Sequence, residues 1–249
     1  MTKTFRMDEA QPRLLDETGQ GIVGAPLDRP EGPKKVSGRA AYAADGLPEN
    51  AAHGVLVRAT IAQGRVTKID ESSVSDVAGL LGVFHGPKMT RNPAQGMAGE
   101  APVQPGNEVH YHGQPIALVV AESFEAARDA AQRLAVSYDA DTDVITDPSR
   151  SETHEQDDPE TAGDFDAAFA ASEVTLDRTY TTPPHAAAAM EPHAAVAEWE
   201  GDAVTLRGAL QMLRFNKKEL ADSLGIDPEQ VRILSPYIGG GFGSKLGIG

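Results

Sequence analysis

Gly239-Gly-Gly-Phe-Gly-Ser-Lys245 is the most distinctive stretch of the sequence. This glycine-rich loop closely follows a strand predicted at residues 231–235. Three consecutive glycines let backbone N–H groups approach a ligand with no side chain in the way, which suits a phosphate or another oxyanion. The spacing does not fit a P-loop, because Ser244 separates Gly243 from the lysine, and it does not fit a Gly-x-Gly-x-x-Gly dinucleotide motif. Taken alone, the glycines leave open a tight turn that needs positive φ.

The residues before this loop are predicted to form strands and helices. Apolar periodicity predicts an amphipathic helix at residues 213–224, and Gly225 ends it, because glycine readily adopts the left-handed conformation of a helix C-terminus. A short helix is predicted to begin at residue 163. Alternating and β-branched residues predict strands at residues 174–180, 194–199 and 203–210.

The N-terminal half is predicted to hold further strands, two helices and a long loop. Ser123 can cap a helix that begins at Phe124, and a shorter helix is predicted at residues 74–81. Residues 86–108 contain several Pro and Gly without periodicity, which predicts a loop. Apolar patterns predict strands at residues 54–62, 65–70, 82–84, 116–121 and 134–138. The mixture of strands and helices favours an α+β fold.

The composition disfavours several kinds of partner. The 249 residues carry a formal net charge of −15, and the isoelectric point is near 4.8. Nucleic acids and anionic membranes are polyanions that such a surface repels, so neither is expected as a partner.

The chain contains no cysteine, so disulfides and cysteine-bound iron–sulfur clusters are excluded from it. The sequence begins without the apolar segment of a signal peptide, and no run of 18 apolar residues is present. We therefore expect a cytoplasmic location, or a periplasmic one if a partner carries the export signal.

An ordered series of motifs is more informative than any one of them. Glu191-Pro-His193 is followed by a strand pair leading to Gln211, then by a helix, a strand and the glycine loop. This series resembles the molybdenum hydroxylase family of xanthine dehydrogenases and aldehyde oxidases. The stretch from His112 to Ser123, with the Ala-rich helix after it, resembles the a/b hammerhead domain of that family.

The resemblance covers about residues 20 to 249, corresponds to the N-terminal third of the molybdenum-cofactor subunit, and is strongest to bacterial three-subunit aldehyde oxidoreductases. It implies an a/b hammerhead domain followed by the first part of a molybdopterin-binding domain. The expected segments are an extended arm at 1–35, the hammerhead domain at 36–145, a linker at 146–162 and the incomplete cofactor domain at 163–249.

The resemblance also implies roles for individual residues. Gln211 matches the glutamine that hydrogen-bonds an oxo ligand of molybdenum, although a strand-end glutamine can also simply face solvent. The loop residues Gly240, Gly241, Phe242 and Gly243 match the segment beside the metal and the pterin. Phe242 is expected to border the substrate channel, with a place in the core as the alternative.

Leu246 is a departure from the purine-oxidising members, which have a glutamate after the lysine. A leucine offers no hydrogen bond, so a purine would leave its polar edge unpaired in the pocket. Leu246 is therefore expected to line a substrate pocket that suits an aldehyde better than xanthine.

Cofactors and partners follow from the same resemblance. The expected cofactor is molybdenum–molybdopterin, in the cytosine dinucleotide form by subtype, with iron–sulfur clusters and FAD on partner subunits. The family's glutamate base is not expected in this chain, so no catalytic residue is assigned, and the remaining molybdenum domain should come from another polypeptide. No metal ligand is assigned either, because His110-x-His112 lacks a third ligand at a suitable spacing.

We therefore expect part of an aldehyde oxidoreductase that oxidises aldehydes to carboxylic acids. Two alternatives remain at this point. The first is a non-catalytic scaffold subunit or a fragment of the same fold. The second is a phosphate-binding module built on the glycine loop alone.

Overall fold

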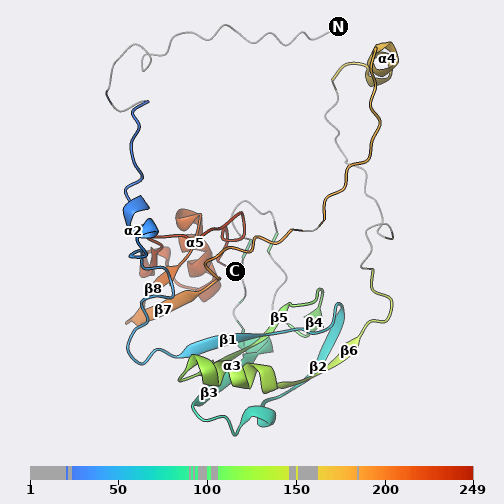
Figure 1. Cartoon of the computed structure of the whole chain (residues 1–249). Coiled ribbons are helices and arrows are strands. Elements are labelled where there is room, and N and C mark those ends of the chain that lie inside the picture. Colours follow the sequence, from blue (N-terminus) through green and yellow to red (C-terminus); the bar gives the residue numbers. More distant parts are fainter. Residues whose placement is uncertain are drawn as a thin grey trace.

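The structure, a computed structural model, describes residues 21, 24–89, 91, 93–94, 100–101, 106–145, 150, 162–183 and 185–248. Three small sheets are present in this part of the chain. Two are formed by the N-terminal half, and the third lies in the C-terminal half (Figure 1).

The first sheet has its most apolar strand in the middle. Strand β5 (Pro115–Ala121) pairs antiparallel with β1 (His53–Arg58) on one side and with β3 (Leu80–His85) on the other. The continuous apolar run of β5 follows from this central position, where Ile116, Ala117, Val119 and Ala121 are all buried.

Helix α3 (Phe124–Arg133) forms as predicted, and it packs against β1 and β5. It begins after Ser123, whose Oγ accepts a hydrogen bond from the Ala126 N–H at 3.2 Å. Ala127 and Ala130 are fully buried, and their small side chains let the helix approach the sheet closely.

The second sheet is built around β2 (Gly64–Asp70), which pairs antiparallel with β4 (Glu108–Val109) and with β6 (Ala135–Ala140). Val66 and Val109 from this sheet are buried in the same hydrophobic core as β5. The two sheets and α3 therefore share one core.

The helix predicted at residues 74–81 is wrong. The structure has a 3₁₀-helix, η1 (Glu71–Val74), and β3 already begins at Leu80. The Ser73 hydroxyl donates to the Asp70 carbonyl at 2.6 Å, and such local side-chain bonds compete with a regular helix.

The third sheet belongs to the C-terminal half. Strands β7 (Ala195–Glu200) and β8 (Ala203–Gly208) form an antiparallel hairpin, and β9 (Val231–Leu234) pairs with β8 in parallel. A parallel pair needs a crossover connection, and α5 provides it. Trp199 of β7 is 52% exposed.

Helix α5 (Leu213–Leu224) packs on β9 and confirms the predicted amphipathic helix. It ends at Gly225, which has a left-handed φ of 68°. Ala221 of this helix is buried with Val204 and Val231 of the sheet. The 3₁₀-helix η4 (Pro228–Gln230) then leads into β9.

The segment before β1 packs on the C-terminal half of the chain. Within the predicted arm, the structure forms a short helix, α2 (Gly32–Val36), so this part is not fully extended. The ammonium of Lys35 donates to the Ile238 carbonyl at 3.2 Å. The rings of Tyr42 and Tyr237 lie 6.0 Å apart.

Residues 162–183 differ from the rest of the C-terminal half. Helix α4 (Phe165–Ala171) forms as predicted, with the Asp164 carboxylate accepting from the Ala167 N–H at 3.0 Å. The predicted strand at 174–180 does not form, because no neighbouring strand is present for it among the described residues. Figure 1 shows α4 well away from the sheets, joined to β7 through a long extended segment.

Most of the predicted linker at 146–162 lies outside the described residues, and so does much of the predicted loop at 86–108. The described part of that loop contains the 3₁₀-helix η2 (Gly86–Lys88) and the start of β4. Among the helices that are described, none is long and apolar enough to cross a membrane.

Candidate functional site

The glycine loop is held in place by a buried ion pair. Lys245 is completely buried, and its Nζ lies 2.9 Å from the Glu191 carbonyl oxygen and 3.1 Å from Glu191 Oε2. The Glu191 side chain is only 10% exposed. Removal of one partner from such a pair costs about 3–5 kcal/mol, because the other charge is left buried without compensation.

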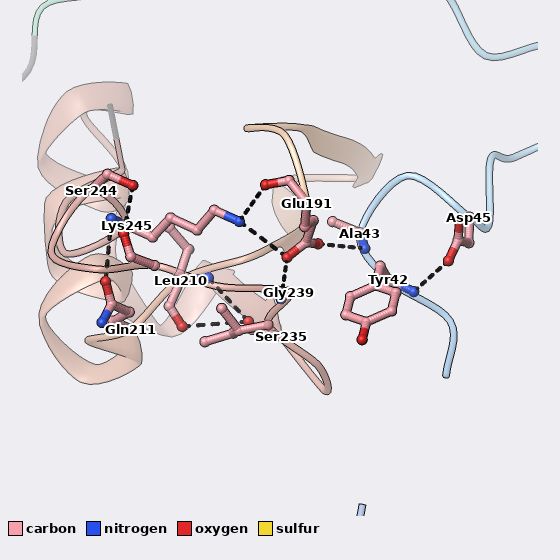
Figure 2. A network of polar contacts seen from close by, with 12 residues as sticks. Tyr42, Ala43, Asp45, Glu191, Leu210, Gln211, Ser235, Gly239, Ser244 and Lys245 are labelled. Carbon is pink, nitrogen blue, oxygen red and sulfur yellow. Dashed lines mark hydrogen bonds and ion pairs between the residues drawn. The ribbon is translucent and has the colours of Figure 1, made fainter. Parts of the chain in front are cut away.

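The Glu191 carboxylate connects three segments of the chain (Figure 2). Its Oε2 accepts from the Gly239 N–H at 2.7 Å, at the start of the loop, and its Oε1 accepts from the Ala43 N–H at 3.5 Å. A Cβ on Gly239 would lie 2.5 Å from the Glu191 Cβ, so only glycine fits there. The motif Glu191-Pro-His193 therefore acts on the loop through its glutamate.

Gln211 is joined to the other end of the loop. Its N–H donates to the Lys245 carbonyl at 2.8 Å, and its side-chain Oε1 accepts from the Lys245 N–H at 3.3 Å. With the amide oxygen engaged in this way, the amide NH₂ is left as the free end. It has no acceptor in the part of the chain that the structure describes.

Gly241 lies against the Gln211 amide. A Cβ on Gly241 would lie 2.5 Å from Gln211 Oε1 and 2.6 Å from its Cδ. The φ of Gly241 is not positive, so glycine is needed here for space and not for backbone conformation. Glycine at 241 thus lets the loop come close enough to fix the amide of Gln211.

The backbone of the loop turns sharply after Gly239. Gly240 and Gly243 have φ of 104° and 88°, and Phe242 has a left-handed φ of 50°, which is uncommon for a bulky residue. The Ser244 hydroxyl and its N–H both donate to the Gly241 carbonyl at 2.8 Å. These two bonds hold the turn closed.

Among the described residues, this turn leaves four successive backbone donors without an acceptor. The N–H groups of residues 240–243 make no hydrogen bond to any described residue, although Gly241 is buried. Buried N–H groups in proteins are nearly always paired. Consecutive N–H groups in a turn of this kind favour an oxygen-rich or anionic ligand.

The two side chains expected at a substrate pocket are exposed. Phe242 is 78% exposed and Leu246 is 42% exposed, so Phe242 lies outside the core that the described residues form. The Leu246 carbonyl accepts from Asn216 Nδ2 at 2.7 Å, which fixes the end of the loop to α5. The structure thus brings Gln211, Gly241 and Lys245 together and leaves both apolar side chains exposed.

Sequence reasoning missed the polar support beneath the loop. Asn216 is fully buried, and its Oδ1 accepts from the Met212 N–H at 3.2 Å while its Nδ2 also donates to Glu219 at 2.9 Å. A signal was available, because Asn216 and Glu219 lie three residues apart in a helix, and Glu219 precedes the apolar Leu220 and Ala221. The buried Lys245 had no comparable signal, because a lysine after a glycine loop normally faces solvent or ligand.

The end of β8 is fastened to the strand before the loop. Ser235 Oγ accepts from the Leu210 N–H at 3.1 Å and lies 3.5 Å from the Leu210 carbonyl (Figure 2). Gln211 is the next residue, so this contact positions it beside the loop. No group of three or more His, Cys, Asp or Glu residues that could hold a metal ion is found within the described ranges.

Comparison with known proteins explains why the two halves of the chain look different. Residues 37–142 match the family model "Aldehyde oxidase and xanthine dehydrogenase, a/b hammerhead domain", and residues 144–248 match "Molybdopterin cofactor-binding domain". The chain belongs to the xanthine dehydrogenase and aldehyde oxidase family. Its fold is a hammerhead domain followed by the beginning of the cofactor-binding domain.

Individual members of this family cover the chain almost completely. The aldehyde oxidoreductase molybdenum-binding subunit PaoC of Escherichia coli K12 is 41% identical over 237 residues, which is 90% of this chain and 31% of that protein. The nicotine 6-hydroxylase large subunit of Paenarthrobacter nicotinovorans is 29% identical over 92% of this chain and 31% of its own length. The chain therefore spans about a third of the length of these relatives.

A crystal structure shows the same fold. Quinoline 2-oxidoreductase from Pseudomonas putida 86 superposes with a TM-score of 0.72 at 26% identity, over 88% of this chain and 31% of that one. The likeness extends through both halves of the chain, so the fold is that of the family and not only of its hammerhead domain.

Proposed function

We propose that this chain forms one wall of the molybdopterin site in an aldehyde oxidoreductase, which oxidises aldehydes to carboxylic acids. The observation that carries the proposal is the run of four backbone donors at residues 240–243, next to the Gln211 amide, whose NH₂ also has no acceptor among the described residues. The chain spans only about a third of the length of its relatives. The activity proposed is therefore that of the whole enzyme and not of this chain alone.

The residues present fit a molybdopterin cofactor. Such a cofactor carries oxo, phosphate and heterocyclic oxygen and nitrogen atoms, all of which accept hydrogen bonds, whereas this wall offers donors. No carboxylate of the described residues forms part of the wall, since Glu191 is already occupied by Lys245 and Gly239. The wall would therefore present donors and no negative charge to the cofactor.

Within this proposal each residue has a separate task. The Gln211 NH₂ would donate to an oxygen atom of the cofactor, in an orientation set by the Lys245 N–H on its other end. The N–H groups of Gly240, Gly241, Phe242 and Gly243 would donate to further oxygen atoms of the cofactor. When bound, the cofactor supplies the redox centre that accepts two electrons from the substrate.

Phe242 and Leu246 are proposed to border the substrate. Both are exposed here, and both are apolar, so they exclude water from the reacting centre without offering a hydrogen bond. A small aldehyde has no polar atoms beyond its carbonyl group, so it loses no further hydrogen bonds when it lies against these apolar side chains. A purine in the same place would leave several polar atoms without a hydrogen-bond partner. The substrate class that fits is therefore an aldehyde.

The rest of the enzyme is proposed to lie outside this chain. We assign the glutamate base and the opposite wall of the cofactor site to the remainder of the molybdenum-binding subunit. Without that remainder the chain is expected to be inactive. Iron–sulfur clusters and FAD are assigned to partner subunits, since no cysteine is available here to hold a cluster. The cytosine dinucleotide form of the cofactor belongs to the same proposal.

The substrate assignment is tested with the purified complex. Steady-state assays with an artificial electron acceptor would compare a series of aldehydes with xanthine. We expect kcat/KM to be far higher for the aldehydes. Turnover of xanthine at a rate equal to that of the best aldehyde would contradict the assignment, and a complex that turns over neither would favour the scaffold alternative.

A further inference from the structure

The loop entry, residues 237–239, leads into the donor loop at 240–243 and is contacted by a segment from much earlier in the chain. This crossing segment, residues 35–45, precedes β1 and packs on the C-terminal half. The Lys35 ammonium donates to the Ile238 carbonyl at 3.2 Å, across 203 positions of the sequence. The crossing segment therefore reaches the residue that lies two positions before the first open N–H.

Tyr42 contacts the two neighbours of Ile238 through its ring. The ring centroids of Tyr42 and Tyr237 lie 6.0 Å apart with the planes tilted by 58°, which is a favourable arrangement for two aromatic rings. A Cβ built on Gly239 would lie 3.4 Å from Tyr42 Cε1, so the same ring also borders the glycine (Figure 2). All three residues of the loop entry are thus contacted by the crossing segment.

The backbone of the crossing segment is fixed at Tyr42 by a closed turn. The Tyr42 N–H donates to Asp45 Oδ2 at 2.8 Å, and the Asp45 N–H donates to the Tyr42 carbonyl at 3.1 Å. The Ala43 N–H donates to Glu191 Oε1 at 3.5 Å, while Oε2 of the same carboxylate accepts from Gly239 (Figure 2). The turn thus sets the place of the Tyr42 ring, and one carboxylate joins the turn to the loop.

Open space adjoins the Tyr42 ring. One hollow is lined by Tyr42 together with Ser235 and Tyr237, and another by Tyr42 together with Glu191 and Gly239. Truncation of the ring would enlarge both hollows. The loop entry would then lose a van der Waals contact that restricts where it can move.

We propose that Tyr42 is a positioning residue for the donor loop: its ring, held by the turn at residues 42–45, sets where Gly239 lies and so where the four following N–H groups point. The inference rests on the proposed function, in which those groups meet oxygen atoms of the cofactor. Hydrogen bonds weaken steeply as they depart from linear geometry, so a small shift of Gly239 would weaken several of them at once. Lys35 supports the same loop entry.

The first readout is local and needs no cofactor. The Gly239 N–H donates to Glu191 Oε2, and the Glu191 N–H donates to the Gly239 carbonyl at 3.2 Å. Hydrogen–deuterium exchange of these two amides therefore reports how firmly the loop entry is held. In the purified complex that contains the full chain, Tyr42→Ala should speed this exchange about tenfold.

Tyr42→Phe is the conservative variant, because the contacts with the loop entry are made by the ring. Its two amides should exchange as in the wild type. Unchanged exchange in Tyr42→Ala would overturn the inference, and so would equally fast exchange in Tyr42→Phe and Tyr42→Ala.

A matched variant separates positioning from a general loss of stability. Tyr138 is a half-buried tyrosine that packs against the hammerhead core, so Tyr138→Ala removes an equal ring from another place. This variant should lower the Tm and leave the exchange of the Gly239 and Glu191 amides as in the wild type. Equally fast exchange in Tyr138→Ala and Tyr42→Ala would contradict a particular role for Tyr42.

Lys35→Met decides the question if Tyr42→Ala does not assemble. It removes the bond to the Ile238 carbonyl and keeps an unbranched side chain, so a smaller rise in the exchange of the same two amides is expected. Lys34→Met, at an exposed position of the same helix α2, is its control and should leave the exchange unchanged. Equal exchange in these two variants would overturn the inference in that case.

The molybdenum content separates this inference from the proposed function. If the wild-type complex carries molybdenum, Tyr42→Ala should lower the content several-fold, while Tyr42→Phe and Tyr138→Ala should keep it. Full content in Tyr42→Ala would overturn the role of the ring in placing the donors. A wild-type complex without molybdenum, in which Tyr42→Ala still speeds exchange, would reject the cofactor assignment and support the hold of the ring on the loop.

Discussion

Lys245 and Glu191 are 54 positions apart and form a buried ion pair, in which the lysine ammonium lies 3.1 Å from the carboxylate and 2.9 Å from the glutamate's own carbonyl oxygen. The same carboxylate accepts from the Gly239 N–H at 2.7 Å. One glutamate therefore fixes the first residue of the glycine loop and also the lysine at its end. The four open N–H groups lie between these two fixed points.

Replacing Lys245 by methionine should destabilise the chain. Loss of the ammonium leaves the nearly buried Glu191 carboxylate uncompensated, at a cost of about 3–5 kcal/mol. Urea denaturation measures this loss. Lys217→Met is the control, because Lys217 forms an exposed pair with Glu229 that should contribute about 0–1 kcal/mol. Equal effects of the two substitutions would show that the buried pair contributes no more than a surface pair.

Replacing Gly241 by alanine should disturb the proposed cofactor wall, which is the loop at residues 240–243 with Gln211. The backbone itself should tolerate alanine, because the φ of Gly241 is not positive. The new Cβ would lie 2.5 Å from Gln211 Oε1, so either the amide or the loop must move. We expect a several-fold lower molybdenum content in the purified complex. Gly201→Ala is the control, since nothing lies within 4 Å of its Cβ, although its φ of 59° adds backbone strain. If Gly241→Ala retained full molybdenum content, the close approach of loop and amide would not be needed.

Replacing Gln211 by alanine removes the proposed donor to the oxo ligand. Loss of one hydrogen bond of about 1.4 kcal/mol in the transition state lowers kcat about tenfold. KM for the aldehyde should change less, because Gln211 is assigned to the cofactor and not to the substrate. Gln132→Ala, at an exposed position of α3, should leave both constants unchanged. A rise in KM with unaltered kcat would place Gln211 at the substrate instead.

The stability of the hammerhead domain is predicted to depend on pH through one ion pair. The Arg133 guanidinium donates to the Asp76 carboxylate, with oxygen atoms 2.5 and 2.7 Å away, and this lowers the pKa of Asp76 below its usual value. A lowered pKa in the folded state means that the contact stabilises the fold above the unfolded-state pKa. That contribution is lost as the pH falls through the folded-state pKa.

Replacing Arg133 by alanine should return the pKa of Asp76 toward the ordinary range, which an NMR titration of the side-chain carboxyl carbon would show. The neighbouring Asp129 also accepts from Arg133, at 3.1 Å. An unchanged Asp76 titration in the variant would mean that the guanidinium is not the cause of the shift.

The elements that sequence reasoning predicted well are those with local causes. The Ser123 cap starts α3, Gly225 ends α5, and the apolar run of β5 is buried in the middle of its sheet. Each depends on a residue within a few positions, or on a burial pattern that the sequence itself displays.

The elements that were missed depend on distant or absent neighbours. The segment at 74–81 looked helical by its apolar spacing, but local serine bonds and pairing of Leu80 with Ala121 decided otherwise. Residues 174–180 have strand character without a strand to pair with in the described chain. The buried Lys245–Glu191 pair joins positions that no local pattern connects.

The central claim is that the loop at residues 240–243 and Gln211 form one wall of a molybdopterin site. The most direct measurement is the molybdenum content of the purified complex that contains this chain, by elemental analysis, together with release of the pterin as its fluorescent oxidised form. We predict molybdenum and pterin in roughly equimolar amounts with the chain. A stable, fully assembled complex with neither would contradict the account and would identify the chain as a scaffold that has kept only the fold.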